Sequence, residues 1–142
     1  MKNLDQKGDG ILCPMAVIVR DGKLLLGLRN YTPDKWKAIS VWTVPGGRSE
    51  TGETIGETLV REAAEEVGIT DLKIKKFLGK IPGAKSPDVV LIFKCETSQE
   101  AKLMEPEKFS EWKWFSADQI PENFINPKAL PIIKRELEKS SI

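Results

Sequence analysis

The sequence predicts an α/β fold in which a mixed sheet is covered by a helix on each side. Apolar, strand-like runs lie both before and after one amphipathic helix pattern, and a second amphipathic helix ends the chain. The 142 residues suffice for one domain with a proper core and are few for two, and they contain no internal repeat or linker. We therefore expect a single domain over residues 11–142, preceded by a flexible, polar lead-in over residues 1–10.

The first strands are predicted as a hairpin. Two apolar runs flank Asp21-Gly22, a dipeptide that favours a tight turn between antiparallel strands. A polar loop follows, and then a short strand leads into a glycine pair, Gly46-Gly47. The predicted strands of this part are 11–20, 23–29 and 41–44.

The central helix is predicted from an apolar residue at every fourth position between Thr54 and Gly68. The residues of this stripe are Ile55, Leu59, Ala63 and Val67. Gly68 suits the left-handed position that follows a helix end, so we expect the helix to stop there.

After this helix the pattern returns to strands and then ends in a helix. The predicted elements are a half-exposed strand at 72–78, a Pro/Gly/Lys-rich loop at 79–87, a central strand at 88–97, a strand at 111–115, a short helical turn at 117–120 and a terminal helix at 127–139. The central strand is nearly all apolar, which is typical of a strand covered on both faces. Pro131 fits the first turn of the terminal helix.

The composition excludes several kinds of chemistry. The chain has no histidine, which removes His-based acid–base catalysis and Ser-His triads, and its net charge of +1 gives no reason to expect a nucleic-acid polymer or an anionic membrane as partner. No apolar run is long enough to span a membrane. Cys13 and Cys95 lie in apolar runs and are expected to be free, buried thiols. We expect a cytoplasmic protein.

Glu62, Glu65 and Glu66 are spaced to share one face of the central helix. Like charges at this spacing destabilise a helix, and the helix dipole disfavours them in its second half. A hard divalent cation such as Mg²⁺ would reverse this repulsion, and Gly46 could add a backbone carbonyl. The alternative is a solvated acidic helix face, which is the common meaning of a charge run.

The spacing of residues around this face identifies a known motif. Positions Gly47, Glu53, Arg61, Glu62, Glu65, Glu66 and Gly68 match the pattern G-x5-E-x7-R-E-U-x-E-E-x-G-U, where U is a bulky aliphatic residue. Such a match arises by chance about once in 10⁹ starting points at average residue usage. The chain resembles the Nudix hydrolases, with Ile69 at the final U and a smaller Ala63 at the first. The resemblance implies an α/β/α sandwich with a mixed central sheet, a catalytic helix and a C-terminal helix.

The resemblance also implies a reaction, which is hydrolysis of a phosphoanhydride bond in a nucleoside diphosphate linked to another group X. The cofactor would be Mg²⁺, with Mn²⁺ as a substitute. The implied metal ligands are Gly46, Glu62, Glu65, Glu66, Glu105 and Glu107. Arg61 is expected to pair with Glu53 and orient it, and the general base is left open between Glu65, Glu53 and a glutamate of the later loop.

The sequence also predicts residues that bind the substrate, and several of them have an alternative, structural interpretation. Those proposed to bind it are Arg29, Gly47, Trp36, Asn123, Phe124 and Asn126, and Lys80 and Lys85 are further candidates for phosphate. Arg29 could instead be a surface residue at a strand end, and Trp36 could cap the core rather than stack on a base. An amide can read a purine edge, but Asn126 could equally cap the terminal helix.

The substrate is expected to be a small molecule. The compact domain resembles the MutT-like enzymes that convert a nucleoside triphosphate into a monophosphate and pyrophosphate, and an oxidised purine such as 8-oxo-dGTP is the leading candidate. The alternatives are a prenyl diphosphate, dihydroneopterin triphosphate, a nucleotide sugar, or a non-catalytic nucleotide-binding module. The chain is expected to be a monomer or a homodimer.

Overall fold

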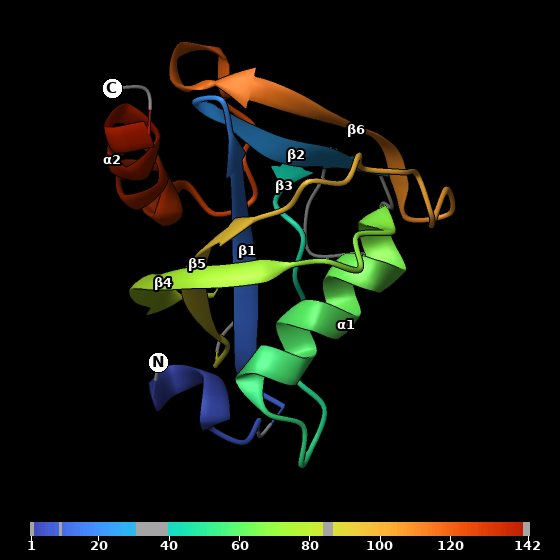
Figure 1. Cartoon of the computed structure of the whole chain (residues 1–142), viewed down its shortest axis with the longest axis vertical. Coiled ribbons are helices and arrows are strands. Elements are labelled where there is room, and N and C mark those ends of the chain that lie inside the picture. The colour runs from blue at the N-terminus through green and yellow to red at the C-terminus, as the bar shows by residue number, and fades with distance from the viewer. Residues whose placement is uncertain (1, 9, 31–39, 84–86, 141–142) are drawn as a thin grey trace.

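The computed structural model describes residues 2–8, 10–30, 40–83 and 87–140 (Figure 1). Tyr31, Trp36 and Lys85 lie outside this part of the chain. The strands are β1 (Leu12–Arg20), β2 (Lys23–Arg29), β3 (Trp42–Thr43), β4 (Lys73–Pro82), β5 (Val89–Glu96) and β6 (Phe109–Ser116). The α-helices are α1 (Ile55–Val67) and α2 (Leu130–Ser140), and the 3-10 helices are η1 (Lys2–Asp5), η2 (Ala117–Gln119) and η3 (Pro127–Ala129). Among the described helices, none has the length and apolar character needed to cross a membrane.

The strands form one mixed sheet, which confirms the predicted fold class. Its order is β3-β2-β1-β5-β4, with β6 paired to the same β2 strand. β1 and β5 run parallel over 12–18 and 89–95, whereas the β1–β2, β2–β3, β2–β6 and β4–β5 pairs are antiparallel. A parallel pair requires a crossover connection, and α1 lies in the one between β1 and β5.

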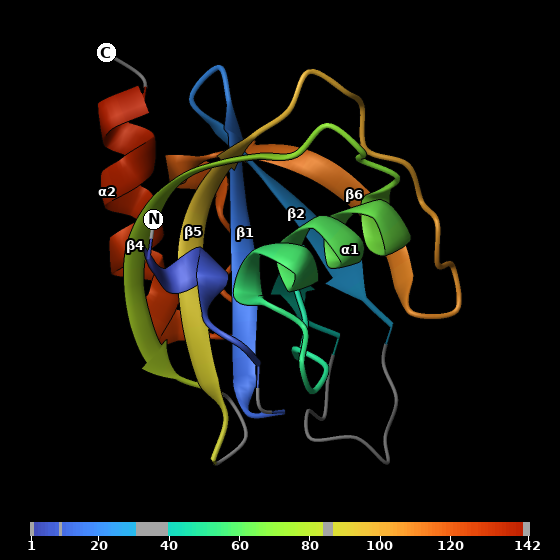
Figure 2. The same ribbon diagram turned by 60° about the horizontal axis from the view of Figure 1, so that its bottom comes forward.

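Alternate residues of β1 face the two helices, as the period of a strand requires. Ala16 and Ile18 belong to the core cluster that contains the apolar stripe of α1. Val17 and Val19 belong to the other cluster, which contains Ile133 and Leu137 of α2. Figures 1 and 2 accordingly show α1 and α2 on opposite sides of the sheet.

The ends of α1 explain why this helix was predictable. Thr54 accepts from the Glu57 backbone N–H at 3.1 Å, and the Glu57 carboxylate accepts from the Thr54 backbone N–H at 2.9 Å. This reciprocal pair is a capping box, which satisfies two backbone donors at the helix start. Gly68 has φ 68° and ends the helix in the left-handed conformation.

Two elements differ from the prediction by three residues or more at one boundary, whereas the boundaries of the others differ by at most two residues. β4 continues to Pro82, although 79–82 was predicted as loop, because these residues pair with 89–92 of β5 at the edge of the sheet, where proline is tolerated. The terminal helix begins as the 3-10 turn η3 and becomes α-helical only at Leu130.

The N-terminal segment, expected to be flexible, makes specific contacts with the start of α1. Its 3-10 helix η1 is followed by Gln6, whose carbonyl oxygen accepts from the Ile55 N–H at 2.9 Å. The Gly8 N–H donates to the Glu53 carbonyl oxygen at 2.7 Å, and Leu4 packs against the α1 core cluster. These contacts attach the segment to α1 and to the loop that precedes it.

β1 and β2 separate soon after their turn, and this separation creates the site. The two strands pair only at Val19–Leu24 and Arg20–Lys23. Farther from the turn, backbone from the glycine loop lies against β1 instead: the Ala16 N–H donates to the Pro45 carbonyl oxygen at 2.8 Å, and Met15 forms a bridge with Gly46. The glycine pair is thereby held between the start of β1 and the second half of α1.

Candidate active site

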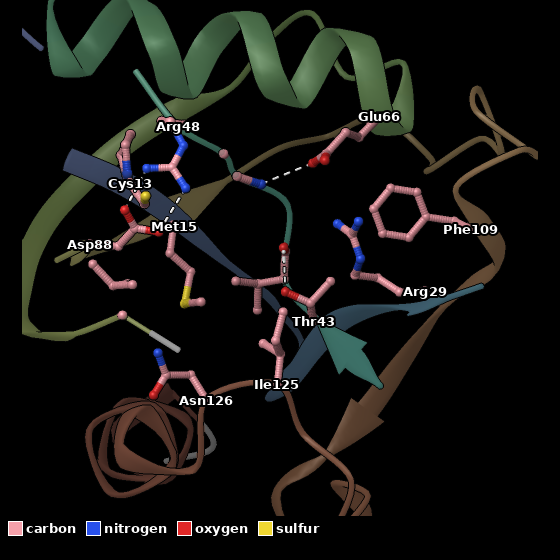
Figure 3. Close-up of a pocket in the computed structure, with 16 residues that line it drawn as sticks. Cys13, Met15, Arg29, Thr43, Arg48, Glu66, Asp88, Phe109, Ile125 and Asn126 are labelled. Atoms are coloured by element: carbon pink, nitrogen blue, oxygen red, sulfur yellow. Dashed lines mark hydrogen bonds and ion pairs between the residues drawn. The ribbon is translucent and has the colours of Figure 1, made fainter. Parts of the chain in front are cut away.

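A cavity of about 430 Å³ opens beside the glycine loop (Figure 3). Its walls come from the start of β1, the end of β2, the glycine loop, the start of β5 and the segment before α2. The residues that line it are Cys13, Pro14, Met15, Arg29, Thr43, Val44, Gly46, Gly47, Arg48, Glu66, Gly83, Asp88, Val90, Phe109, Ile125 and Asn126. A volume of this size is ordinary for a site that binds a small molecule.

Glu66 is the carboxylate that α1 presents to this cavity. It is only 7% exposed, and its Oε1 accepts a hydrogen bond from the Gly46 N–H at 2.9 Å. Burial raises the pKa of Glu66 to about 8; the Gly46 hydrogen bond and the Arg29 charge oppose this shift, whereas the charges of Glu62 and Glu105 add to it. A buried carboxylate with like charges beside it is a natural place for a cation.

Arg61 lies among the other carboxylates of the motif. Its Nε and Nη2 donate to the two oxygens of Glu53, at 2.7 and 3.0 Å. Its Nη1 donates to Glu62 at 3.1 Å and to Glu65 at 3.2 Å. The expected Arg61–Glu53 pairing is therefore present, and the same guanidinium also offsets repulsion between Glu62 and Glu65.

These contacts distinguish Glu53 from Glu65 as candidates for the general base. The bidentate hydrogen bonds from Arg61 dominate over burial and lower the pKa of Glu53 to about 2, so Glu53 is a poor proton acceptor. Its position instead suits the support of Arg61. Glu65 is more open, with 48% of its side chain exposed, and Arg61 is its ion-pair partner.

Of the two loop glutamates, Glu105 lies close to this group. Its charge raises the pKa values of both Glu62 and Glu66, as an additional cause beside their burial. Glu105 Oε1 is buried and has no hydrogen-bond partner in the described part of the chain, while Oε2 lies 3.4 Å from Lys108 Nζ. Glu107 is exposed, and no contact of the described residues brings it to the cavity.

The donor set fits a hard cation, although its side chains are held by other partners. Within the described residues no three acidic or cysteine side chains converge as a metal cluster. Glu66 is bonded to Gly46, and Glu62 and Glu65 are bonded to Arg61. Glu62, Glu65 and Glu66, together with Glu105 Oε1, which has no partner among the described residues, nevertheless supply the oxygen ligands that such an ion prefers. At Gly47 a Cβ would come 2.5 Å from Glu62 Oε1, so glycine allows this carboxylate to approach the loop.

The predicted substrate residues fall into two groups. Arg29 and Gly47 line the cavity, and the Arg29 guanidinium lies 5.6 Å from the centre of the Phe109 ring. Phe124 is 2% exposed and belongs to the α2 core, so the prediction that it binds substrate is wrong. Lys80 lies on the exposed edge of β4 and does not line this cavity.

Of the two predicted asparagines, only Asn126 lines the cavity. Asn123 does not line the cavity. Its side-chain Nδ2 donates to the Ser40 carbonyl oxygen at 3.0 Å, and its backbone carbonyl oxygen accepts from the Trp42 N–H. Asn126 lines the cavity, and its Nδ2 donates to the Pro82 carbonyl oxygen at 3.3 Å. Asn126 does occupy the N-cap position of η3, as the capping alternative expected, but its side chain makes no capping hydrogen bond there.

Sequence reasoning missed the pair that closes the other end of the cavity. Arg48 Nη1 and Nη2 donate to the two oxygens of Asp88 at 2.5 and 2.7 Å, and Nη1 also donates to the Gly10 carbonyl oxygen. Cys13 lies beside this pair, and burial, with the Asp88 charge, raises its pKa. Arg48 occupies a variable position of the motif and Asp88 follows it by 40 residues, so no local spacing connects them.

Comparison with known proteins agrees with this arrangement. A family model for the NUDIX domain matches residues 14–136. An oxidized purine nucleoside triphosphate hydrolase of Danio rerio is 31% identical over 118 residues, covering 78% of this chain and 69% of the relative. An NAD-capped RNA hydrolase of Mannheimia succiniciproducens is 30% identical over 112 residues, and the chain spans only 41% of its length.

Solved structures show the same fold at low identity. A NUDIX-family hydrolase of Clostridium perfringens is 19% identical with a TM-score of 0.72, and the match covers 92% of this chain and 98% of the other. An ADP-ribose pyrophosphatase of Streptococcus suis is 20% identical with a TM-score of 0.71, covering 94% of each chain. With the motif, the fold and the family match in agreement, this chain belongs to the Nudix hydrolase family.

Proposed function

We propose that the protein is a Mg²⁺-dependent nucleoside triphosphate pyrophosphohydrolase that releases a nucleoside monophosphate and pyrophosphate. The observation that carries this proposal is the cavity, which has a buried carboxylate and a guanidinium at one end and a separate polar group at the other. Hydrolysis of a substrate that carries a nucleoside diphosphate is the more general form of the same proposal.

The acidic residues at the α1 end suit a divalent cation, which members of this family generally need. Glu62, Glu66, Glu105 and the carbonyl of Gly46 would hold it, with Mn²⁺ as a possible substitute for Mg²⁺. When bound, such an ion neutralises phosphate charge and lowers the pKa of a coordinated water. The raised pKa of Glu66 supports this assignment, because burial removes the water that stabilises an ionised carboxylate, and a bound cation would stabilise it instead.

The surrounding residues have separate tasks. Arg29 points into the cavity near Glu66 and is placed to bind phosphate oxygens (Figure 3). Glu53 holds Arg61 by two hydrogen bonds, and Arg61 in turn orients Glu62 and Glu65. We assign the general base to Glu65, since its partly exposed carboxylate is accessible to water whereas Glu53 is held by two hydrogen bonds.

The reaction then needs one proton transfer and one bond exchange. The base removes a proton from a water whose oxygen attacks phosphorus, and the phosphoanhydride P–O bond breaks as pyrophosphate leaves. Arg29 stabilises the charge on the phosphate oxygens during this exchange.

For the base of the nucleotide, an oxidised purine such as that of 8-oxo-dGTP is the leading candidate. The name of the Danio rerio relative supports it, and 69% of that protein is matched, against 41% of the NAD-capped RNA hydrolase. The names of other relatives, an NAD-capped RNA hydrolase and an ADP-ribose pyrophosphatase, keep larger nucleoside diphosphates as the second candidate. Non-nucleotide diphosphates are a third possibility.

A substrate panel tests the proposal. The protein with Mg²⁺ would be given 8-oxo-dGTP, the normal nucleoside triphosphates, ADP-ribose, a nucleotide sugar and a prenyl diphosphate, and the products would be separated chromatographically. We expect a monophosphate and pyrophosphate from a triphosphate, and loss of nearly all turnover in Glu66→Gln. Release of single phosphates, turnover of the non-nucleotide substrate alone, or binding without turnover would each contradict the proposal.

A further inference from the structure

The end of the cavity away from Glu66 carries polar groups that phosphate hydrolysis does not explain. Arg48 holds both oxygens of Asp88, and Asn126 also lines the cavity. Figure 3 shows Arg48 and Asp88 on one side of the view and Glu66 and Arg29 on the other. Asp88 and Arg48 differ in exposure, since the Asp88 side chain is 11% exposed and that of Arg48 is 49% exposed.

Asp88 and Asn126 are held by neighbouring residues at the end of β4. The Asp88 carbonyl oxygen accepts from the Gly83 N–H at 2.7 Å, and the Asn126 amide donates to the carbonyl oxygen of the preceding residue, Pro82, at 3.3 Å. The Asp88 backbone and the Asn126 side chain are thus both attached to one short stretch of backbone. Arg48 fixes the orientation of the Asp88 carboxylate through its two hydrogen bonds.

Apolar side chains separate this end from the acidic end. They are Met15, Val44, Val90 and Ile125. A nucleobase has apolar faces and a polar edge, so its faces suit these residues and its edge suits the polar end. The polyphosphate then lies toward Glu66 and Arg29, as the proposed function requires.

The polar groups favour one kind of base edge. An ionised carboxylate only accepts hydrogen bonds, and each of its oxygens can accept more than one, so Asp88 can bind a ligand while Arg48 holds it. Guanine offers two adjacent donors, N1–H and the 2-amino group, beside the O6 acceptor, which suits an amide N–H of Asn126. Adenine would instead direct the lone pair of N1 at the carboxylate.

We infer that Asp88, supported by Arg48, and Asn126 read the base edge and select a guanine-type purine with a 6-oxo and a 2-amino group. This inference rests on the proposed function, because it assumes that the phosphates occupy the Glu66 end. Asp88 and Arg48 determine specificity and take no part in the bond exchange.

The test compares dGTP with dITP, which lacks only the 2-amino group, and with dATP. For the wild type we expect kcat/KM for dGTP to exceed that for dITP by about tenfold or more, as loss of a hydrogen bond to a charged group implies. Asp88→Asn should reduce this ratio to about threefold or less. The matched control is Asp21→Asn in the β1–β2 turn, which should keep the wild-type ratio; an equal ratio in wild type and Asp88→Asn would overturn the inference.

A second variant and a binding measurement cover the case in which Asp88→Asn folds poorly. Asn126→Ala should lower kcat/KM for dGTP and dITP alike relative to dATP, because only the first two carry O6; an equal loss for dATP would contradict its assigned role. Binding of GMP and IMP, measured calorimetrically, should show the same preference without turnover. If no triphosphate is hydrolysed but GMP is still preferred through Asp88, the proposed function fails and the base-reading site stands. If triphosphates are hydrolysed and Asp88→Asn changes no ratio, only the base-reading site fails.

Discussion

The backbone N–H of Gly46 donates to Oε1 of Glu66 across 2.9 Å and so connects the glycine loop to the second half of α1. This contact partly compensates a carboxylate that is 7% exposed, but burial outweighs it and keeps the pKa of Glu66 at about 8. The pair therefore couples the protonation of one side chain to the position of the loop.

The stability of the metal-free protein should fall as pH rises from about 4.5 to about 8. In this interval the unfolded chain ionises Glu66 while the folded chain keeps its proton, so ionisation favours unfolding. Glu53 and Asp71, whose pKa values are lowered to about 2 by hydrogen bonds, are charged in both states here and do not oppose the trend.

The measurement is the melting temperature in the presence of a chelator at pH 5 and pH 8. We expect a decrease of several degrees in the wild type and a much smaller one in Glu66→Gln. Added Mg²⁺ should remove most of the decrease. An identical pH dependence in the two proteins would show that Glu66 ionises as easily in the folded chain as in the unfolded one.

Gly47→Ala should weaken the use of Mg²⁺ without unfolding the protein. The added Cβ would come 2.5 Å from Oε1 of Glu62, so this flexible carboxylate must move. We expect the Mg²⁺ concentration for half-maximal rate to rise about tenfold, as displaced ligand groups generally cause. Gly56→Ala is the control, since its Cβ would meet nothing closer than 3.4 Å; equal Mg²⁺ dependence in the two variants would contradict the role given to Glu62.

Arg61→Lys should lower both stability and turnover. Lysine cannot reproduce the two hydrogen bonds to Glu53 at 2.7 and 3.0 Å together with the contacts to Glu62 and Glu65. Since these groups are partly exposed, we expect a loss of about 1–2 kcal/mol in urea denaturation, and a decrease in kcat of about tenfold or more.

A double-mutant cycle with Glu53→Gln identifies the source of this loss. The two changes should be less than additive, because either one alone breaks the pair. Full additivity would mean that Arg61 and Glu53 act independently.

Glu136→Gln should destabilise the attachment of α2 and leave the chemistry unchanged. Glu136 is 4% exposed and lies 3.1 Å from Lys76, 3.6 Å from Lys94 and 3.6 Å from Lys139. Burial raises the pKa of Glu136, but the hydrogen bond from Lys76 and the charges of the three lysines together outweigh burial and lower it. Its contribution is thus present above the ordinary pKa of a glutamate and is lost as pH falls.

For this variant we expect a loss of about 1–3 kcal/mol at pH 7 and kcat/KM within about twofold of the wild type. Glu122→Gln is the control, because Glu122 is exposed. A large decrease in kcat/KM would show that these ion pairs also fix the cavity wall formed by the segment before α2.

Much of the fold could be predicted because local signals and tertiary structure agree. Thr54, Glu57 and Gly68 mark the ends of α1 by chemistry that needs only nearby residues. The continuation of β4 to Pro82 could not be predicted, because the composition of 79–82 favours a loop and only pairing with β5 makes it a strand. The contacts of Gln6 and Gly8 depend in the same way on a partner far along the chain.

The site was predictable only where the motif itself encodes it. The spacing of Glu62 and Glu66 predicted both on one helix face, and in the structure Glu66 lines the cavity. Phe124 was predicted to contact a base and is instead core, since an apolar residue before a helix has no signal that distinguishes these two places. Asp88 escaped notice because its partner Arg48 is 40 residues away, and only the folded chain brings them together.

The early separation of β1 and β2 has a consequence for how wide a ligand the protein admits. Since the strands share only two residue pairs beside their turn, the distance between the wall with Met15 and the wall with Arg29 is not set by sheet hydrogen bonds. It is set by the inserted backbone around Pro45 and Gly46, which acts as a spacer. A change in this insert alone should therefore widen or narrow the space for a ligand, while the sheet and both helices stay as they are.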